Sequence, residues 1–305
     1  MKILLFGKGG QVGRELQRSL APLGEVVALG SSGEPWPSDF RQPEALRETV
    51  QALKPQIIVN SAAYTAVDRA ETEVDAARAI NAVAPRVLAE AAHACGAWLV
   101  HYSTDYVFDG SGSRPWTEDD APAPLNVYGQ TKLEGEQAVR SACPRHLVFR
   151  TSWVYARHGG NFIRTVLRLA AEREALRLVD DQVGAPTGAD LIADVTAHAL
   201  RQALLEPRLA GLYHLSASGE TSWFAYARYL LDEARRQSEV ARTMKVRTME
   251  PIPSSAYPTP ARRPLNSRLD TRRLQSAFGL CLPPWQPGVA RVLEDLLQPP
   301  AWVRA

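Results

Sequence analysis

The chain has 305 residues, a length that suits two domains of ordinary size and a core large enough to need no disulfide to hold it. Its composition, 45% hydrophobic, 22% charged and 8% aromatic, is that of a soluble globular protein and excludes collagen-like, coiled-coil, disulfide-scaffold and disordered chains. With 35 basic and 33 acidic residues the net charge is +2, too small for a chain-wide nucleic-acid or membrane-surface footprint.

No stretch resembles a targeting or membrane-spanning segment. The apolar run at Ile3–Phe6 stops at Gly7, short of the roughly 7–15 residues of a secretory signal's apolar region, and no run approaches the ~18 residues of a spanning helix. Cys95, Cys143 and Cys281 are far apart and form no CxxC pair. These features predict a cytoplasmic chain with no membrane partner and with reduced, buried thiols, and they exclude a cysteine zinc site.

Short apolar strands alternate with helical patterns through the first half of the chain. Strands are predicted at 2–6, 25–29, 56–60, 97–103 and 146–150, and helices at 11–21, 43–53, 75–95 and 125–141. Because the strands are almost uniformly apolar, both faces of their sheet must be covered by helices. The alternation therefore predicts a doubly wound parallel sheet of the Rossmann type.

The second half keeps strands and helices but spaces them less regularly. Strands are predicted at 176–180 and 211–215, and helices at 188–205 and 222–235. The prolines between 251 and 264 predict an extended loop over a surface. A structureless segment at 105–124 is unusually long for a compact domain and predicts a functional loop.

A glycine-rich turn joins the first strand to the first helix. Gly7, Gly10 and Gly13 permit a tight turn with close backbone approach to a phosphate, and the helix N-terminus offers free N–H groups to a pyrophosphate. The spacing differs from the usual GxGxxG of dinucleotide sites, and an ordinary strand–helix turn is the alternative. Its place at the first strand of an alternating fold favours dinucleotide binding.

The end of the second strand bears on the choice of cofactor. Leu29 is followed by Gly30 and Ser31, with no acid to bind an adenosine 2′-hydroxyl. Small side chains leave room for a 2′-phosphate, and Lys8 could lie near it. This favours NADPH, with use of NADH left open.

A tyrosine and a lysine four residues apart carry the candidate chemistry. Tyr128 and Lys132 share one face of a predicted helix, where the ammonium is expected to lower the pKa of the phenol so that it can protonate a ketone receiving a hydride. Only five of the 35 basic residues are lysines, which makes this placement notable. Thr104, or its neighbour Ser103, ends the fourth strand, where open α/β sheets bind ligands, and could hold the carbonyl.

Several segments together resemble a known family. They are ILLFGKGGQVG at 3–13, NSAAYTAVD at 60–68, NAVAP at 81–85, STDYVFDG at 103–110, YGQTK at 128–132, RTSW at 150–153, DQVGAPT at 181–187 and RPLNSRLD at 263–270. The chain is similar to the dTDP-4-dehydrorhamnose reductases of the extended short-chain dehydrogenase/reductase superfamily. The likeness runs from residue 1 to about residue 297.

The resemblance implies the activity and its residues. The reaction is reduction of the C4 ketone of dTDP-4-dehydro-L-rhamnose, with a dTDP-sugar as substrate and no nucleic-acid partner. Tyr128 is the proton donor, Lys132 its electrostatic partner and ribose ligand, and Thr104 assists. The implied cofactor-binding residues are Gly7, Gly10, Gln11, Val12, Gly30, Ser31, Asp39, Phe40, Ala62, Ala63, Tyr64 and Thr65, with Asp39 and Phe40 beside the adenine. The implied sugar-binding residues are Thr104, Asp105 and Trp153.

The resemblance also divides the chain into two domains. Residues 1–152 are expected to form the dinucleotide-binding domain, with residues 174–182 returning to its sheet. Residues 153–305 are expected to form a smaller, mainly sugar-nucleotide-binding α/β domain. On charge alone, Arg262, Arg263 and Arg268 could bind the substrate diphosphate. The equally weighted alternative is that these three arginines are solvent-exposed surface residues with no ligand.

Two carboxylates raise the question of a metal. Some family members hold Mg²⁺ between subunits, and the corresponding carboxylates here are Glu15 and Asp190. The resemblance therefore implies a candidate Mg²⁺ site and a homodimer. The alternative is that Asp190 pairs locally and binds no metal. The histidines show no ligand spacing and are interpreted as structural; they are His93, His101, His146, His158, His198 and His214.

Two other functions stay open. One is another sugar-nucleotide enzyme of the superfamily, an epimerase or a 4,6-dehydratase, although Asp105 is followed by Tyr106 and not by the second acid that a dehydratase needs. The other is a non-catalytic NADP-binding regulatory subunit. The presence of Thr104, Tyr128 and Lys132 favours an enzyme.

Overall fold

The structure is a computed structural model that describes residues 1–32, 35–236 and 244–297. The first half contains β1 (Lys2–Phe6), α1 (Gln11–Leu20), β2 (Glu25–Leu29), α2 (Ala45–Leu53), β3 (Ile57–Asn60), α3 (Val67–Ala70), α4 (Val74–Arg78), α5 (Ala84–Cys95), β4 (Trp98–Thr104), α6 (Val127–Ala142) and β5 (His146–Thr151). The second half contains β6 (Val154–Tyr155), α7 (Phe162–Glu172), β7 (Ala175–Val179), β8 (Val183–Gly184), β9 (Thr187–Gly188), α8 (Ala189–Leu205), β10 (Gly211–His214), β11 (Thr221–Ser222), α9 (Trp223–Arg235), β12 (Thr248–Ile252), α11 (Arg272–Phe278) and α12 (Trp285–Leu297).

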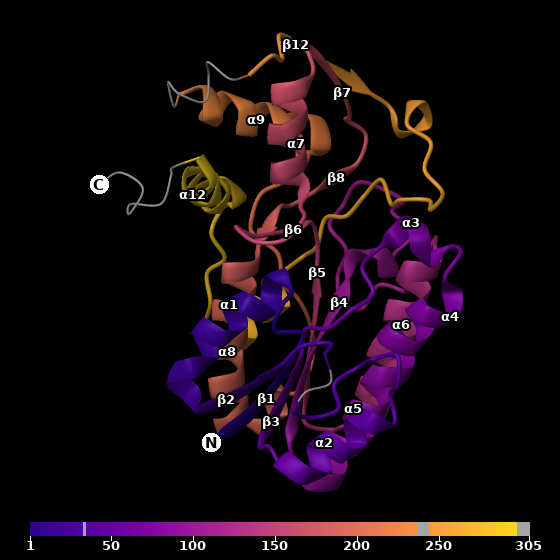
Figure 1. Cartoon of the computed structure of the whole chain (residues 1–305), viewed down its shortest axis with the longest axis vertical. Coiled ribbons are helices and arrows are strands. Elements are labelled where there is room, and N and C mark those ends of the chain that lie inside the picture. The colour runs from indigo at the N-terminus through magenta and orange to yellow at the C-terminus, as the bar shows by residue number, and fades with distance from the viewer. Residues whose placement is uncertain (33–34, 237–243, 298–305) are drawn as a thin grey trace.

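A six-stranded parallel sheet forms the centre of the molecule, as the alternating sequence predicts (Figure 1). Its strand order is β10-β5-β4-β3-β1-β2. Leu4 of β1 pairs with Val27 of β2 on one side and with Ile58 of β3 on the other. Leu4 and the next residue, Leu5, are both fully buried although their side chains point to opposite faces. The sheet is therefore covered on both faces.

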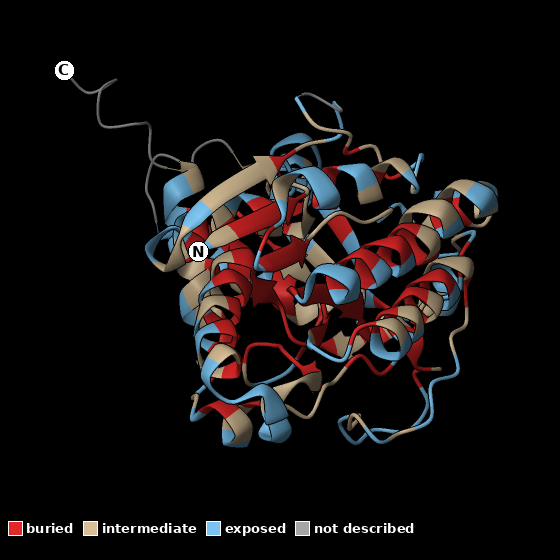
Figure 2. Cartoon of the chain, turned by 90° about the horizontal axis from the view of Figure 1, so that it is seen from below, coloured by how far each residue is buried: buried red, intermediate tan, exposed pale blue. Residues whose placement is uncertain are grey.

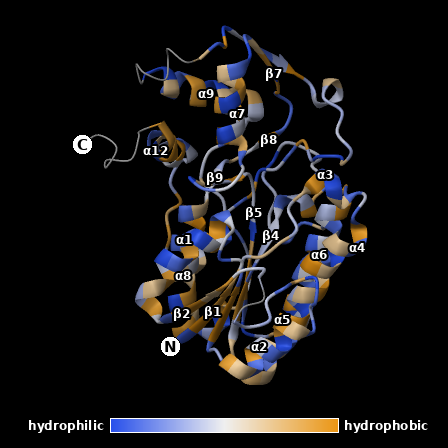
Figure 3. Cartoon of the chain, viewed as in Figure 1, coloured by the Kyte–Doolittle hydropathy of each residue, from blue (hydrophilic) through white to orange (hydrophobic). Residues whose placement is uncertain are grey.

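Two layers of helices provide that cover. Helices α1, α8 and α11 pack on the face that contains Leu5, and α2, α5 and α6 pack on the face that contains Leu4. Figure 2 shows the buried residues gathered on the strands and on the inner sides of these helices, and Figure 3 shows the central strands as largely hydrophobic. The layers leave the carboxyl ends of the strands free for a site.

A second, smaller core lies beyond those carboxyl ends, at the top of Figure 1. It contains buried side chains from α7, α9 and α12 and from β7, including Ile163, Tyr226, Leu230 and Trp285. Strands β7 and β12 pair with each other in parallel. The predicted return of residues 174–182 to the main sheet is wrong, because β7 pairs with β12, and β10 is the strand that extends the main sheet beside β5.

Several helices depart from the predicted boundaries; the helix predicted at 125–141, for example, spans Val127–Ala142. The helix predicted to start at Pro43 begins at Ala45. The single helix predicted at 75–95 is divided by a π-helical turn at Ala79–Val83. In that turn the side chain of Asn81 accepts a hydrogen bond from the Tyr64 amide and donates to the Tyr64 carbonyl, so a buried polar contact replaces regular helix.

The thiols and the prolines also differ in part from expectation. All three cysteines are free, but only Cys143 is buried, while Cys95 and Cys281 are exposed. Pro251 lies within β12, a strand of a two-stranded sheet, where its missing N–H is tolerated. Among the described residues, no helix combines the length and apolar character needed to cross a membrane.

Candidate active site

A cavity of ≈ 670 Å³ opens at the carboxyl ends of β1 to β5. Most of the residues expected to bind a dinucleotide line it, as do the two central residues of the candidate chemistry, Tyr128 and Lys132. The predicted residues in the lining are Gly7, Gly10, Gln11, Val12, Gly30, Ser31, Asp39, Phe40, Ala62, Ala63, Thr65, Tyr128 and Lys132. Segments far apart in the sequence therefore meet in one place.

The side chain of Tyr64 is an exception. Its hydroxyl donates to a carboxylate oxygen of Glu73 at 2.5 Å, and Tyr64 is absent from the cavity lining. Its neighbours Ala63 and Thr65 do line the cavity. The structure thus brings the segment to the cavity but directs the tyrosine ring elsewhere.

The glycine turn is shaped by close backbone contacts. Gly7 has a φ of +88°, and a Cβ on Gly13 would lie 2.0 Å from the Gly7 carbonyl oxygen. Gly10 precedes α1, and no side chain caps that helix, so its first N–H groups stay open. A Cβ on Gly9 would have open space around it, with no neighbouring described atom within 4 Å. Gly7 and Gly13 therefore build the turn, and Gly9 and Gly10 leave its outer surface open to a phosphate.

The end of the cavity at Asp39 and Phe40 contains an arginine, Arg41, that is not among the predicted residues. Arg41 donates to both oxygens of Asp39 and, like Asp39, lines the cavity. The hydrogen bonds from Arg41 lower the pKa of Asp39, so the carboxylate stays charged. Phe40 is buried with its ring edge-on to Phe6 at 5.5 Å. The aliphatic stem of Lys8 passes Gly30, where a Cβ would lie 3.4 Å from Lys8 Cε.

The start of α6 positions Tyr128. The side chain of Asn126 caps the helix by accepting from the Gly129 amide at 2.8 Å. A Cβ on Gly129 would lie 2.2 Å from the Tyr106 carbonyl oxygen, so glycine allows α6 to approach the segment after β4. The rings of Tyr106 and Tyr128 then meet edge to face at 5.6 Å. This close packing holds the phenol at the cavity.

Burial governs the ionisation of the two central residues. Burial, with a smaller contribution from the charge of Asp105, raises the pKa of Tyr128 to about 12, against an opposing hydrogen bond with Thr104. The predicted lowering of this pKa by Lys132 is wrong: the pKa is raised, and burial of the phenol is the main cause. Burial lowers the pKa of Lys132 to about 8, opposed by the charge of Glu136. Lys132 Nζ donates to the Tyr102 carbonyl at 2.5 Å.

Thr104 and Asp105 lie beside the phenol at the end of β4. Thr104 Oγ1 donates to Asp105 Oδ1 at 3.1 Å and accepts from the Tyr106 amide at 3.2 Å. Burial raises the pKa of Asp105 to about 6, partly offset by hydrogen bonds from Ser267 and Thr104. Asp105 Oδ2 is buried without a partner. It is an acceptor available to a ligand hydroxyl.

Trp153, which follows β5, has an unusual backbone conformation. Its φ is +47°, rare for a residue other than glycine, and its ring stacks on Trp223 with centroids 3.6 Å apart. A Cβ on Gly184 would lie 2.9 Å from the Trp153 ring and 3.1 Å from Ser267, the hydroxyl neighbour of Asp105. None of the predicted sugar-binding residues, Thr104, Asp105 and Trp153, is in the lining of the 670 Å³ cavity, and Trp153 is linked to Asp105 through Gly184 and Ser267.

Two hydroxyls support the fit of a dinucleotide. Ser103 Oγ on β4 and Thr151 Oγ1 on β5 are buried, line the cavity and have no hydrogen-bond partner within the protein. Buried polar groups normally find partners, so a polar ligand group beside them is expected. The sequence analysis weighed Ser103 as an alternative to Thr104 and missed Thr151, although both stand at predicted strand ends.

The other charged candidates are already paired. Arg263 pairs with Asp68 at 2.7 Å and Arg268 with Glu220 at 2.6 Å, while Arg262 is exposed. The structure therefore does not gather the three arginines into a diphosphate clamp.

Within the described residues of one chain, Glu15 and Asp190 form no Mg²⁺ site, and the predicted site between two subunits stays a prediction. Glu15 and Asp190 line one polar cavity, but Glu15 pairs with Arg18, and Asp190 pairs with Arg291 and also accepts from the Leu191 amide. Across residues 1–32, 35–236 and 244–297, no group of three or more His, Cys, Asp or Glu side chains is arranged to hold a metal ion. The homodimer expected from such a metal stays a prediction.

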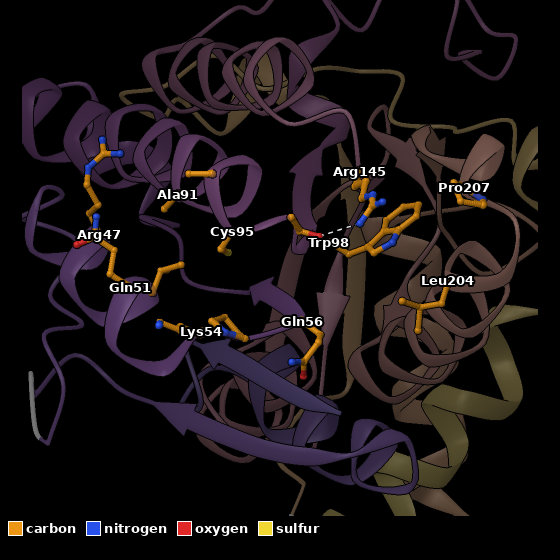
Figure 4. Close-up of a pocket in the computed structure, with 14 residues that line it drawn as sticks. Arg47, Gln51, Lys54, Gln56, Ala91, Cys95, Trp98, Arg145, Leu204 and Pro207 are labelled. Carbon is orange, nitrogen blue, oxygen red and sulfur yellow. Dashed lines mark hydrogen bonds between the residues drawn. The ribbon is translucent and has the colours of Figure 1, made fainter.

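A larger cavity of ≈ 770 Å³ lies at the opposite end of the sheet (Figure 4). Trp98 and Gln56 line it at the amino ends of β4 and β3. Arg47 is already bonded to Glu90, and Arg145 to the Gly96 carbonyl. None of the predicted site residues lies in it, so size alone does not mark the functional site.

The fold and the cavity define the class. A doubly wound parallel sheet with an open glycine turn, a Tyr–Lys pair on α6 and a threonine at the end of β4 is the arrangement of an NAD(P)-dependent short-chain dehydrogenase/reductase. The model of the RmlD substrate binding domain matches residues 1–298. The chain belongs to this family, the dTDP-4-dehydrorhamnose reductase family, as its sequence segments predict.

Named relatives and solved structures agree with that assignment. A dTDP-4-dehydrorhamnose reductase of Escherichia coli K12 is 56% identical over 296 residues, covering 97% of this chain and 98% of the relative. One from Burkholderia thailandensis is 48% identical, with 97% and 99% covered. A crystal structure from Clostridium acetobutylicum has a TM-score of 0.86 at 33% identity, over 98% of this chain and 100% of that one. One from Bacillus anthracis, in complex with NADP, has a TM-score of 0.84 at 34% identity, over 96% and 99%.

Proposed function

We propose that this chain reduces the C4 ketone of dTDP-4-dehydro-L-rhamnose to dTDP-L-rhamnose with NADPH or NADH. The observation that carries the proposal is the meeting of Tyr128, Lys132 and the glycine turn in one cavity. The name shared by relatives up to 56% identical, each matched over nearly its full length, supports the substrate. The NADP complex of the Bacillus anthracis relative supports the cofactor.

The cofactor would lie along the carboxyl ends of the strands. The open N-terminus of α1 at Gly10 would hold its pyrophosphate, and Asp39 and Phe40 would flank its adenine. Ser103 and Thr151 would take its polar groups at the other end of the cavity. When bound, the nicotinamide supplies the hydride for C4 of the sugar.

Tyr128 would supply the proton. Because its pKa is raised to about 12, the phenol keeps its proton at neutral pH and can give it to the more basic alkoxide that forms at C4. Lys132, buried nearby with a positive charge, would stabilise the phenolate that remains. Thr104 would orient the carbonyl by turning its hydroxyl proton from Asp105 Oδ1 to the carbonyl oxygen, and Asp105 would accept from a sugar hydroxyl through its unpartnered oxygen.

We favour NADPH over NADH. The Lys8 side chain passes Gly30, and no acid directly follows β2 at Gly30 and Ser31 to accept from a ribose 2′-hydroxyl. Arg41 lies at the same end of the cavity, where its charge is paired with Asp39. A 2′-phosphate would gain from the Lys8 ammonium, whereas a 2′-hydroxyl would gain much less. Mg²⁺ has no place in this proposal.

The test is direct. The chain is incubated with enzymatically made dTDP-4-dehydro-L-rhamnose and either NADPH or NADH, with the UDP counterpart as a matched control. We expect one cofactor oxidised for each dTDP-L-rhamnose formed, and a higher kcat/KM with NADPH. A sugar that isomerises while the cofactor stays unchanged would identify an epimerase, and cofactor binding without any turnover would identify a regulator.

A further inference from the structure

A buried ion pair lies one helical turn behind Lys132. Glu136 follows Lys132 by four residues on α6, so the two side chains share a helix face with Tyr128. Glu136 Oε2 accepts from Arg150 Nε at 2.9 Å, and Oε1 accepts from the Arg150 NH2 group at 2.6 Å. Lys132, Glu136 and Arg150 are all nearly inaccessible to solvent.

This arrangement leaves the lysine without a carboxylate partner. The charge of Glu136 acts on Lys132, yet among the described residues Lys132 forms no ion pair. Its ammonium donates to the Tyr102 carbonyl at the cavity wall. An unrestrained buried carboxylate four residues away would be the strongest available partner for that ammonium and would draw it away from the cavity.

Arg150 is itself fixed by its surroundings. It belongs to β5, its guanidinium lies 5.0 Å from the centre of the Phe108 ring, and its NH1 group is 3.5 Å from His214 Nε2. His214 Nδ1 is 3.0 Å from the Trp116 carbonyl oxygen. The bidentate partner of Glu136 is therefore supported by β10 and by the loop after β4.

We propose that Glu136 and Arg150 are positioning residues for Lys132. The Glu136 carboxylate keeps the Lys132 ammonium charged, and Arg150 binds that carboxylate so that it does not pair with the ammonium and draw it out of the cavity. The inference rests on the proposed use of a dinucleotide, since the charged ammonium is what a ribose and the phenol require. It assigns no contact with substrate to either residue.

Other charged groups around this face are few. They are His101 on β4, Asp105 after β4, His214 on β10 and Arg140 on α6 itself. Burial lowers the pKa of both His101 and His214, so both are neutral. The buried face of α5 is apolar, and Arg78 of α4 pairs with the outward Glu134.

The two members of the pair should therefore act on Lys132 in opposite directions. Removing the carboxylate in Glu136→Gln lowers the pKa of Lys132, so the loss of its charge occurs at lower pH. Removing the guanidinium in Arg150→Met frees the carboxylate, raises that pKa and pulls the ammonium from the cavity. A merely structural role would not produce opposite shifts.

The measurement is the dissociation constant of NADPH as a function of pH, followed by fluorescence and therefore independent of turnover. In the wild-type chain, affinity should fall with rising pH as Lys132, whose pKa is about 8, loses its charge. Glu136→Gln should move this fall to lower pH and Arg150→Met to higher pH, each by about half a unit or more. Arg150→Met should also weaken binding at neutral pH. Arg140 does not serve as a control, because its NH1 group lies 3.6 Å from Glu136 Oε1. The control is Glu134→Gln, which removes a carboxylate of the same helix that pairs outward with Arg78 and should leave the profile unchanged.

A double variant covers the case in which a single change prevents folding. Glu136→Met with Arg150→Met replaces the pair by apolar side chains of similar size, a change that buried pairs often tolerate. It should shift the fall in affinity to lower pH. Shifts in the same direction for both single variants, or an unshifted profile in the double variant, would overturn the proposal. Wild-type binding of NADPH without reduction of the sugar would instead contradict only the proposed function.

Discussion

At the scale of single residues, a phenol and a carboxylate have pKa values that burial displaces in a useful direction. Tyr128 keeps its proton up to a pH of about 12, and Asp105 keeps its own up to about 6. At neutral pH the site therefore combines a proton donor with an anionic acceptor. Both states are set by the same buried surroundings at the end of β4.

Replacing Tyr128 tests the donor. Tyr128→Phe removes the hydroxyl but keeps the ring contact with Tyr106, so the fold and the affinity for NADPH should persist. Turnover of the 4-keto sugar should fall about 100-fold or more, the usual contribution of a positioned acid. The matched control is Tyr213→Phe, which loses one hydrogen bond to the Leu209 carbonyl far from the cavity. Equal turnover in both variants would remove Tyr128 from the mechanism.

Replacing Asp105 tests the cost of its charge. Because the pKa of about 6 in the folded chain exceeds the unfolded value near ~3.9, ionisation of Asp105 destabilises the fold fully above pH 6 and not at all below about pH 4. Asp105→Asn should therefore raise the free energy of unfolding by about 1–3 kcal/mol at pH 7.5 and much less at pH 4. Denaturant titrations at both pH values measure this.

The same variant should bind substrate less well. The neutral amide cannot replace the unpartnered carboxylate oxygen as a strong acceptor, so KM for the dTDP-sugar should rise. Greater stability together with unchanged KM would mean that Asp105 does not contact the sugar.

At the scale of elements, the sequence predicts most of the sheet because its strands are apolar along their whole length. β1, β3 and β4 appear as predicted, and so does the long loop after β4. The destination of 174–182 could not be predicted in this way, since an apolar strand fits any sheet edge and only long-range packing pairs β7 with β12. The π-turn before α5 likewise depends on a distant contact, between Asn81 and Tyr64.

The site shows the same division. Gly10, Tyr128 and Lys132 belong to local patterns and could be predicted from spacing, and Thr151 could have been found because it directly follows a predicted strand. Arg41 carries no local signal and enters the cavity through the fold. Burial of Tyr128 could not be derived from its spacing to Lys132, and for that reason the direction of its pKa was wrong. Local patterns predict which elements meet, but they do not predict how far the side chains between those elements are shielded from water.

The glycine turn supplies a prediction at this scale. In Gly13→Ala the new methyl group would lie 2.0 Å from the Gly7 carbonyl oxygen, so α1 must move away from the turn. We expect a loss of at least about 2 kcal/mol in the free energy of unfolding and a marked loss of NADPH affinity. Gly160→Ala is the control, since no neighbouring described atom lies within 4 Å of its Cβ position. Melting curves and fluorescence titrations compare the two.

At the scale of the whole molecule, the paired carboxylates near α8 bear on metal dependence. Arg291 bonds to Asp190 and Arg18 to Glu15, so the charge that a cation would neutralise is already neutralised. Excess EDTA should leave the melting temperature, the subunit state and the reductase rate unchanged, and added Mg²⁺ should not raise the melting temperature. A rise with Mg²⁺ that saturates would show a site that these arginines do not block.

The path of the chain has a consequence for how such a protein can change over time. β10 comes late in the sequence yet completes the main sheet, and α8, also late, packs against α1. β7, which lies earlier in the chain than both, belongs to the second core and pairs with β12. No single boundary in the sequence separates the residues that would hold the dinucleotide from those that would hold the sugar. A new specificity therefore cannot be acquired by exchanging one contiguous segment, and must arise through scattered point changes around Trp153 and Ser267.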